Sequence, residues 1–168
     1  MQTAPILPNE ADRLCAVFNL KILDTAIEER FELITKEAID FFKVPISTIS
    51  ILDKDREWYK SAQGIEEREG PRNISFCGHA LHHEDILIIE DTLKDPAFSD
   101  NPYVVRQSRP IRFYAGKALL SYESTLPVGV FCIKDHQPRT MHLTEIAKFL
   151  DLAHKAEIEL NKKDNNLV

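Results

Sequence analysis

PRNISFCGHALHHEDILIIED, residues 71–91, carries the decisive pattern of this 168-residue chain, because a loop, a short helix and an apolar strand follow one another without a break. Ser75 stands at the expected N-cap of the helix, which places Cys77 and His79 in its first turn. The free backbone N–H groups of a helix start favour negative charge, so we expect the thiol of Cys77 to have a lowered pKa. The run Ile86–Ile89 suits a buried strand. We expect any ligand site to touch this segment.

The chain before this segment predicts two helices and two strands. Asn9 suits the N-cap of a first helix that ends near Leu20. The capping-box pattern Thr25-Ala-Ile-Glu28 predicts a second helix that ends before Pro45. Residues 46–53 and 57–62 read as two strands, followed by a loop over residues 63–73. One face of the second helix is predicted to be apolar, with Phe31, Ile34, Ala38, Phe41 and Phe42.

The chain after this segment predicts a covering segment, a hairpin and a final helix. Residues 97–110 are rich in polar residues and prolines, which is typical of an irregular lid with one or two helical turns; Asp95 followed by Pro96 suits a helix start. Residues 111–120 and 128–135 predict a β-hairpin. A last helix begins near Thr144, and its apolar side is predicted to hold Ile146, Ala147, Leu150 and Ala153. Strands joined as hairpins with helices at both ends predict an α+β fold with an antiparallel sheet.

Composition excludes several functional classes. No window approaches 18 consecutive apolar residues, so we expect no membrane span. A net charge of −6 argues against nucleic acid as a partner. Cys15, Cys77 and Cys132 are an odd number of widely spaced cysteines, which predicts reduced thiols and a cytoplasmic location. The N-terminus lacks the pattern of a signal peptide.

Several short motifs follow one another along the chain: Asn9-Glu10, Arg13-Leu14, Leu23-Asp24-Thr25, Phe31, Val44-Pro45-Ile46, Asp53-Lys54-Asp55-Arg56, Trp58, Pro71-Arg72, Ser75-Phe76-Cys77-Gly78-His79-Ala80, Asp91, Asp95, Phe98, Asp100-Asn101-Pro102, Arg112-Phe113-Tyr114-Ala115-Gly116, Gly129, Cys132 and Asp135. Together and in this order they resemble the GAF domains of bacterial signalling proteins such as sensor kinases and diguanylate cyclases.

This resemblance implies a domain over residues 9–160, with a flexible tail at 1–8 and a frayed tail at 161–168. It implies an antiparallel sheet of about six strands, with helices on one face and a small-ligand pocket on the other. It also implies a sensory module that forms a homodimer through its terminal helices. The chain departs from the family pattern where Lys134 replaces an apolar residue.

The predicted ligand pocket combines the central segment with neighbouring strands. The residues expected to bind the ligand are Ser50, Phe76, Cys77, His79, Asp91, Arg112 and Tyr114. Arg112 needs an acidic partner in so apolar a strand, and Asp91, Asp95 and Asp100 are candidates. The sequence does not identify the ligand or any cofactor.

Four interpretations of Cys77 and His79 remain. They pack one end of a pocket, attach a bilin, bind a metal with His83, or act in thiol chemistry. The favoured function is a non-catalytic sensory or regulatory domain that binds a small ligand and signals through its terminal helices. The alternative is a thiol-based enzyme or redox sensor centred on Cys77, similar to a methionine sulfoxide reductase. Neither a metal site nor a catalytic group is predicted under the favoured interpretation. Cys15 and Cys132 are expected to be small core residues.

Overall fold

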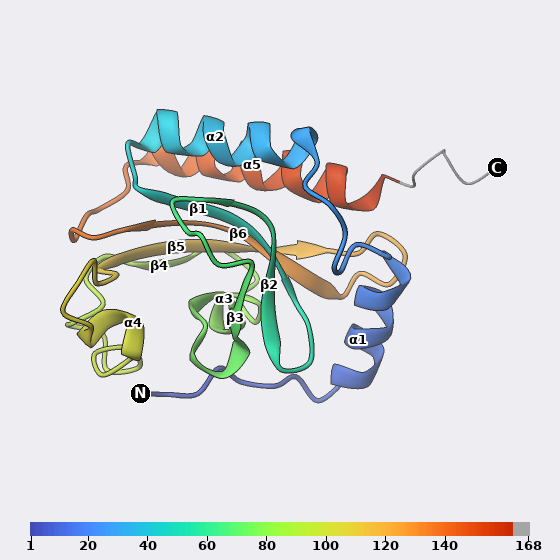
Figure 1. The fold of residues 1–168 in the computed structure, drawn as a ribbon, viewed down its shortest axis with the longest axis horizontal. Helices are drawn as coiled ribbons and strands as arrows, with labels where there is room; N and C mark the ends of the chain where they lie inside the picture. The colour runs from blue at the N-terminus through green and yellow to red at the C-terminus, as the bar shows by residue number, and fades with distance from the viewer. Residues whose placement is uncertain (163–168) are drawn as a thin grey trace.

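Strands β1 (Ile46–Leu52) and β6 (Pro127–Asp135) form the centre of an antiparallel sheet in a computed structural model that describes residues 1–162. The six strands lie in the order β3-β2-β1-β6-β5-β4 (Figure 1). The others are β2 (Arg56–Gln63), β3 (Glu69–Pro71), β4 (Leu87–Ile89) and β5 (Phe113–Leu120). Every neighbouring pair is antiparallel, which confirms the predicted α+β architecture. The predicted strand at residues 86–89 is short and forms an edge of the sheet.

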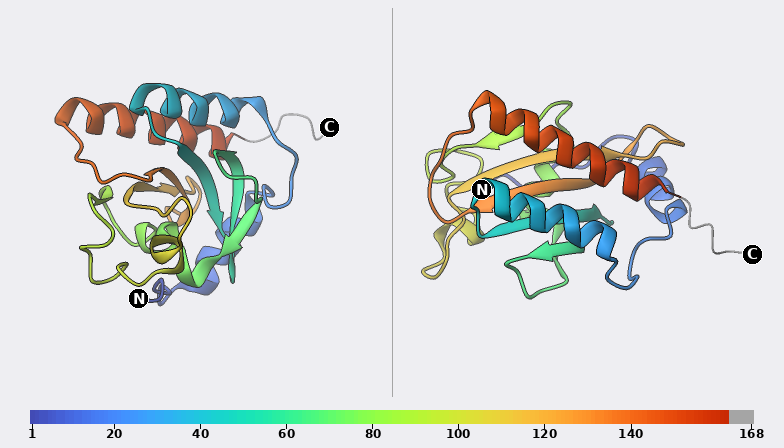
Figure 2. Two further views of the ribbon diagram at one scale, coloured as in Figure 1. Left: turned by 60° about the vertical axis from the view of Figure 1, so that its left-hand side comes forward. Right: turned by 90° about the horizontal axis from the view of Figure 1, so that it is seen from above.

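Helices α2 (Glu29–Phe42) and α5 (Leu143–Asn161) lie side by side on one face of the sheet (Figures 1 and 2). Their apolar sides meet the sheet in a core where the Phe149 ring lies 4.9 Å from Phe131 and 6.2 Å from Phe42. Burial of these aromatic side chains and of the aliphatic ones packed with them stabilises this layer. None of the helices in the described part of the chain is long and apolar enough to cross a lipid bilayer.

Three helix predictions are wrong in detail. Thr25 and Glu28 form no capping box, because α2 begins at Glu29 and the Thr25 hydroxyl donates to the carbonyl of Ile22. Phe41 is about half exposed, while its neighbour Phe42 is buried. On α5 the predicted Ala153 is buried, but its buried neighbours are Phe149, Leu152, Ala156 and Leu160, while Ile146, Ala147 and Leu150 are not buried.

Helix α3 (Phe76–Ala80) covers the opposite face of the sheet, where the irregular segment and α4 (Pro102–Val105) also lie. Ser75 is the N-cap as predicted, since its hydroxyl accepts from the N–H of Gly78 at 3.1 Å. The Phe76 ring stacks between Phe98 and Tyr114, with centroids 4.8 and 5.2 Å away. This second apolar cluster anchors α3 to β5.

The lid segment is held by Asn101 rather than by the predicted helix start at Asp95. Asn101 Oδ1 accepts from the N–H of Tyr103 and caps α4, while its Nδ2 donates to the carbonyl of Ile74 at 2.9 Å. Asp95 Oδ1 accepts from the N–H of Ala97 in a turn. Asn101 is fully buried, so it links the lid to the segment before α3.

Helix α1 (Glu10–Asn19) is attached through buried ions as well as apolar contacts. Glu10 accepts from Arg13 at 2.7 and 2.8 Å and from Arg72 at 2.5 Å, and both arginines are buried. Asn9 precedes the helix as predicted but makes no side-chain cap. Cys15 is exposed, so the prediction that it is a core residue is wrong.

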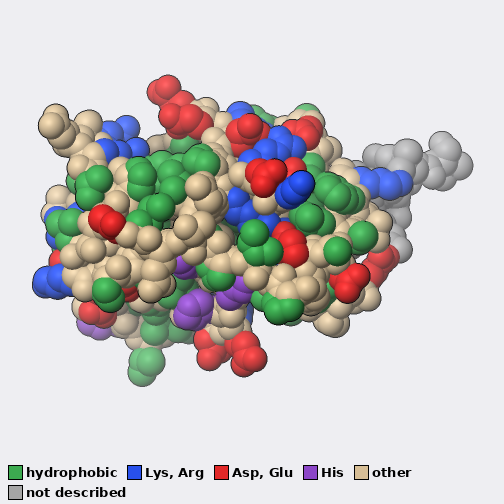
Figure 3. Space-filling model, turned by 90° about the horizontal axis from the view of Figure 1, so that it is seen from below, with side chains coloured by type: hydrophobic (Ala, Val, Ile, Leu, Met, Phe, Trp, Pro, Cys, Tyr) green, Lys and Arg blue, Asp and Glu red, His purple; other side chains and the backbone are tan. Residues whose placement is uncertain are grey.

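Residues 1–5 lie across α3, where the sequence predicts a flexible tail. The N–H groups of Gln2 and Ala4 donate to the carbonyls of Ala97 and Asn73, each at 3.0 Å. Ring nitrogens of His79 and His82 bond the carbonyls of Gln2 and Pro5 at 3.2 and 2.8 Å. Figure 3 shows this face, on which histidine side chains gather near the middle.

Helix α5 is fastened at both ends. Arg139, in the loop that precedes it, lies 3.4 Å from Glu145 in the first turn. At the other end Asn161 donates to the carbonyl of Leu120 and accepts from the N–H of Tyr122, both at 2.8 Å. Asn161 therefore ends the helix rather than beginning a frayed tail. Residues 163–168 of that predicted tail lie outside the described residues.

Candidate functional site

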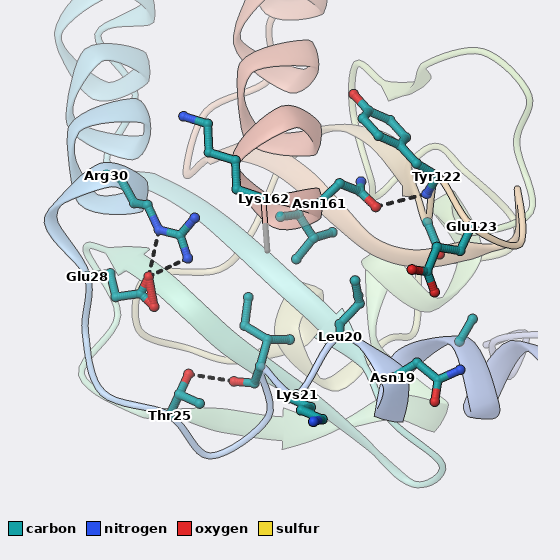
Figure 4. Close-up of a pocket in the computed structure, with 14 residues that line it drawn as sticks. Asn19, Leu20, Lys21, Thr25, Glu28, Arg30, Tyr122, Glu123, Asn161 and Lys162 are labelled. Atoms are coloured by element: carbon teal, nitrogen blue, oxygen red, sulfur yellow. Dashed lines mark hydrogen bonds and ion pairs between the residues drawn. The ribbon is translucent and has the colours of Figure 1, made fainter. Parts of the chain in front are cut away.

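Two cavities of similar size lie at opposite parts of the molecule. The first, of about 610 Å³, lies where the ends of α1 and α5 approach the β5–β6 turn (Figure 4). The second, of about 590 Å³, lies on the α3 side of the sheet. The second is lined by Ile46, Tyr59, Gly64, Ile65, Glu66, Glu67, Glu69, Gly70, Pro71, Phe76, Tyr103, Arg106, Ser108, Arg109, Ile111, Lys134 and His136.

Polar groups of the first cavity are bonded to one another. The Arg30 guanidinium donates to Glu28 at 2.6 Å, and the Thr25 hydroxyl donates to the carbonyl of Ile22, also at 2.6 Å. The N–H of Tyr122 is bonded to Asn161 (Figure 4). A ligand there would have to compete with these existing bonds, which would cost binding free energy. We therefore regard the α3-side cavity as the candidate site.

The walls of the α3-side cavity are aromatic and its floor carries a buried cation. Tyr59 on β2 and Phe76 on α3 are both almost fully buried. Lys134 on β6 pairs in register with Ile46 on β1 and Tyr114 on β5, so the three side chains share the α3 face of the sheet. Only 6% of Lys134 is exposed.

Gly70 lets β3 cover the two tyrosines of the cavity. A Cβ at this glycine would lie 3.1 Å from the hydroxyl of Tyr103 and 3.3 Å from that of Tyr59. Burial raises the pKa of both tyrosines, and the nearby charge of Glu57 adds to the effect. Both hydroxyls therefore remain protonated donors at neutral pH.

Three of the predicted site residues form solid packing behind this cavity. Tyr114 donates its hydroxyl to Cys77 Sγ at 3.3 Å, and Ser50 Oγ lies 3.8 Å from the same sulfur. Ser50 also donates to the buried carboxylate of Glu57 at 2.8 Å, which accepts from Ser75 as well. Ser50, Cys77 and Tyr114 are completely buried.

The remaining predicted residues are separated. Phe76 lines the α3-side cavity, and His79 faces the N-terminal segment. Asp91 and Arg112 bond each other near the start of β5, where Arg112 Nη2 lies 2.8 Å from Asp91 Oδ1. Among the residues the structure describes, Phe76 alone of the predicted set lines either cavity. The predicted border therefore differs from the cavity lining at every residue except Phe76, and ligand binding by the other residues stays a prediction. Asp91 does supply the acidic partner predicted for Arg112.

The surroundings of the Cys77 thiol disfavour its ionisation. Burial raises the pKa of Cys77 well above its ordinary value, and hydrogen bonding with Cys132 and the charge of Glu57 add to this shift. The helix start at Ser75 does not overcome this burial, so the expected lowering of the pKa of Cys77 is wrong. Cys77 Sγ lies 3.6 Å from Cys132 Sγ, and both thiols are free.

No group of three metal-ligating side chains was found over residues 1–162. His79 is bonded to the N-terminal segment, and His83 is exposed at the end of the short helix.

Sequence reasoning missed most of the cavity lining. Tyr59, Tyr103 and His136 come from three distant segments, and only their packing brings them together. One signal was present, because Lys134 replaces an apolar residue expected from the family pattern. A charged residue within an otherwise apolar central strand marks either a buried pair or a site.

Comparison with known proteins places the chain within one family. The family model described as the GAF domain matches residues 26–160. A cyclic di-GMP phosphodiesterase of Pseudomonas aeruginosa is 40% identical over 139 residues, which cover 83% of this chain and 23% of that protein. The chain thus spans about a quarter of this curated relative.

Solved structures share the fold at low identity. The GAF domain of an Acinetobacter phosphoenolpyruvate-protein phosphotransferase has a TM-score of 0.61 at 14% identity, covering 89% of this chain and 92% of that one. The type II free methionine-R-sulfoxide reductase of Thermoplasma acidophilum has a TM-score of 0.62 at 12% identity, covering 79% and 90%. With the family match over most of its length, the chain belongs to the GAF domain family.

Proposed function

We propose that this domain is a non-catalytic sensor that binds a small ligand in the α3-side cavity and passes the binding event to helix α5. The observation that carries this proposal is the cavity itself. It has a volume of about 590 Å³, aromatic and apolar side chains in its walls, and several charged and polar groups, and its size suits a small molecule.

A chain of contacts connects the cavity floor to α5. Lys134 is followed by Asp135, whose carboxylate lies 3.3 Å from Arg139. Arg139 also donates to the carbonyl of Phe42 at 3.0 Å and lies 3.4 Å from Glu145 at the start of α5. A ligand that shifts β6 would therefore move both α2 and α5, provided that it binds the shifted state more tightly.

The output would be another domain or protein. Because the Pseudomonas aeruginosa relative is named a cyclic di-GMP phosphodiesterase, we propose control of such an enzyme as the output. We also propose that the domain forms a homodimer through its helices, which would pair two output domains. Apolar side chains exposed on these helices support dimerisation: Phe18 on α1, Leu33 and Phe41 on α2, and Leu150 and Ile158 on α5.

Redox sensing by Cys77 and Cys132 is a second candidate function. Their sulfur atoms are 3.6 Å apart, so a disulfide between α3 and β6 needs only a modest approach. Both thiols are buried, however, which limits access by oxidants. Burial raises the pKa of Cys77 and acts in the same direction on Cys132, but the hydrogen bond with Cys77 and the charge of Lys134 lower the pKa of Cys132 against the effect of burial. We therefore favour the sensor that binds a ligand.

Nuclear magnetic resonance with a library of small fragments tests ligand binding directly. Fragments that bind should shift the amide signals of Tyr59, Tyr103 and Lys134. The Ser108→Trp variant should weaken this binding, because Ser108 lines the cavity mouth. Gln107→Trp is the matched control, since Gln107 is exposed and adjacent but does not line the cavity.

Native mass spectrometry of the purified chain adds an independent readout. A co-purified small molecule should be present with the parent and Gln107→Trp, and lost with Ser108→Trp. If no fragment shifts the cavity signals and no small molecule co-purifies, the proposed sensor function is wrong.

A further inference from the structure

We infer, on the basis of the ligand-binding function proposed above, that the α3-side cavity selects a small anion, with a carboxylate or phosphate group received by Lys134. Lys134 combines three properties that are rarely found together. It is a buried cation, it lines the cavity, and it makes no ion pair with any carboxylate in the described part of the chain. A buried ammonium without a paired anion is costly, which favours an anionic ligand as its partner.

The ammonium is expected to remain charged before the ligand arrives. Burial acts to lower the pKa of Lys134, but the proximity of Cys132 and Glu57 raises that pKa well above its usual range. Glu57 makes no ion pair with Lys134 in the described part of the chain; its two oxygens accept from Ser50 and Ser75. The charge of Lys134 is thus held in place and remains available to a ligand.

Other polar groups of the cavity suit the same ligand. The hydroxyls of Tyr59 and Tyr103 remain protonated, because burial raises the pKa of both residues. They can donate to anionic oxygens in addition to the Lys134 ammonium. Phe76 and Ile111 supply apolar contact for the body of the ligand.

His136 adds a hydrogen-bonding position beside the anion site. Its Nδ1 lies 2.9 Å from the carbonyl of Pro110, and because a carbonyl only accepts, the tautomer with the hydrogen on Nδ1 fits this bond. Its Nε2 is then an acceptor, and this atom is buried without a hydrogen-bond partner in the described structure. A ligand that also carries an O–H or N–H group would satisfy it.

Charges at the cavity mouth nearly balance, with one acid in excess of the bases. Glu66, Glu67 and Glu69 lie at one side of the lining, and Arg106 and Arg109 come from the lid. All five are exposed, so water and salt screen them far more than they screen Lys134. The buried cation therefore decides the sign of the ligand.

The test compares probes that differ in charge but little in shape. Benzoate, benzamide and phenyl phosphate are titrated into the full 168-residue chain, with binding measured by shifts of the Tyr59, Tyr103 and Lys134 amide signals. Benzoate or phenyl phosphate should bind about tenfold or more tightly than benzamide, because a hydrogen bond to a charged group is worth more than a neutral one. The tighter of the two anions identifies the carboxylate or the phosphate as the preferred group.

Two variants make the result specific to Lys134. Lys134→Met keeps the length of the side chain without its charge and should lose the preference for the anion. Lys134→Arg should retain it. Melting curves of both variants verify that the fold persists.

Three outcomes would overturn the anion assignment: equal binding of benzoate and benzamide, an unchanged preference in Lys134→Met, or binding of neutral fragments alone. These outcomes leave the proposed sensor function intact. If neither anions nor neutral fragments bind, both proposals fail.

Discussion

Arg112 donates to the same oxygen of Asp91 from two nitrogens, with Nη2 at 2.8 Å and Nε at 3.2 Å from Oδ1. The pair joins the end of β4 to the start of β5. Its side chains are partly exposed, at 25% for Arg112 and 13% for Asp91, so the pair is weaker than a fully buried one.

Replacing Arg112 by alanine should therefore cause a small decrease in melting temperature and faster hydrogen exchange at Thr92, whose N–H donates to the Arg112 carbonyl. Arg109→Ala, in the exposed part of the lid, should change neither measurement. Identical exchange at Thr92 in Arg112→Ala and the parent would show that the pair does not hold this segment.

Glu10 should make the protein sensitive to acid. Burial acts to raise the pKa of Glu10, but the Arg13 and Arg72 guanidiniums lower it from 4.5 to about 2. Because the folded pKa lies below the unfolded one, the stabilisation is fully present above pH 4.5 and is lost as the pH falls towards 2. We expect this carboxylate to contribute about 1–2 kcal/mol after solvent screening is allowed for.

Chemical denaturation between pH 2 and 7 measures this contribution. Glu10→Gln should be less stable than the parent at pH 7, with the difference shrinking towards pH 2. Glu66→Gln, at an exposed position, should follow the parent throughout. A difference between Glu10→Gln and the parent that stays constant with pH would contradict the linkage.

Adjacent residues of α5 should respond very differently to alanine. Phe149 is fully buried against Phe131 and Phe42, so Phe149→Ala should lower the free energy of unfolding by about 3–5 kcal/mol. Leu150 is 42% exposed, and Leu150→Ala should change it by no more than about 0.5 kcal/mol. Urea unfolding of the two variants at low protein concentration checks the orientation of the helix. Similar losses for both would show that the buried side is assigned incorrectly.

The three thiols should react in two classes. Cys15 is exposed, whereas Cys77 and Cys132 are buried. At pH 7 an aromatic disulfide reagent should modify Cys15 promptly and the other two only after denaturant is added. Cys15→Ser should remove the fast phase. A fast phase that remains in Cys15→Ser but disappears in Cys77→Ser would favour the thiol-based alternative.

The sequence predicted the fold well where a feature depends only on residues that are close together in the chain. Ser75 caps α3 because its hydroxyl and the N–H of Gly78 are three residues apart, which is a local relationship. Runs of apolar and β-branched residues likewise located β1 and β6, both of which are buried on both faces. Apolar spacing located α5 but misjudged its buried side, because Phe149 and Leu152 of the neighbouring stripe are buried while Leu150 is exposed.

The candidate site could not be predicted because it depends on contacts between distant segments. Glu10 and Arg72 were both noted as family motifs, but nothing local shows that they bond each other across 62 positions. Likewise, Tyr59 and Tyr103 meet only because β3 folds over them at Gly70. The pKa of Cys77 was mispredicted for a related reason: the sequence indicates a helix start there but not how deeply that helix is buried.

The attachments at both ends of α5 determine how this helix can move. Bonded near Glu145 to the loop after β6, and at Asn161 to the β5–β6 turn, it cannot unwind at either end without breaking those contacts. Its 19 residues form a rod of about 28 Å, lying along the hairpin that holds it. If the ligand proposed above tilts the β5–β6 hairpin, the helix bonded to it at both ends would tilt with it as one body. Whatever follows Asn161 would therefore sense the angle of the hairpin rather than the length or winding of the helix.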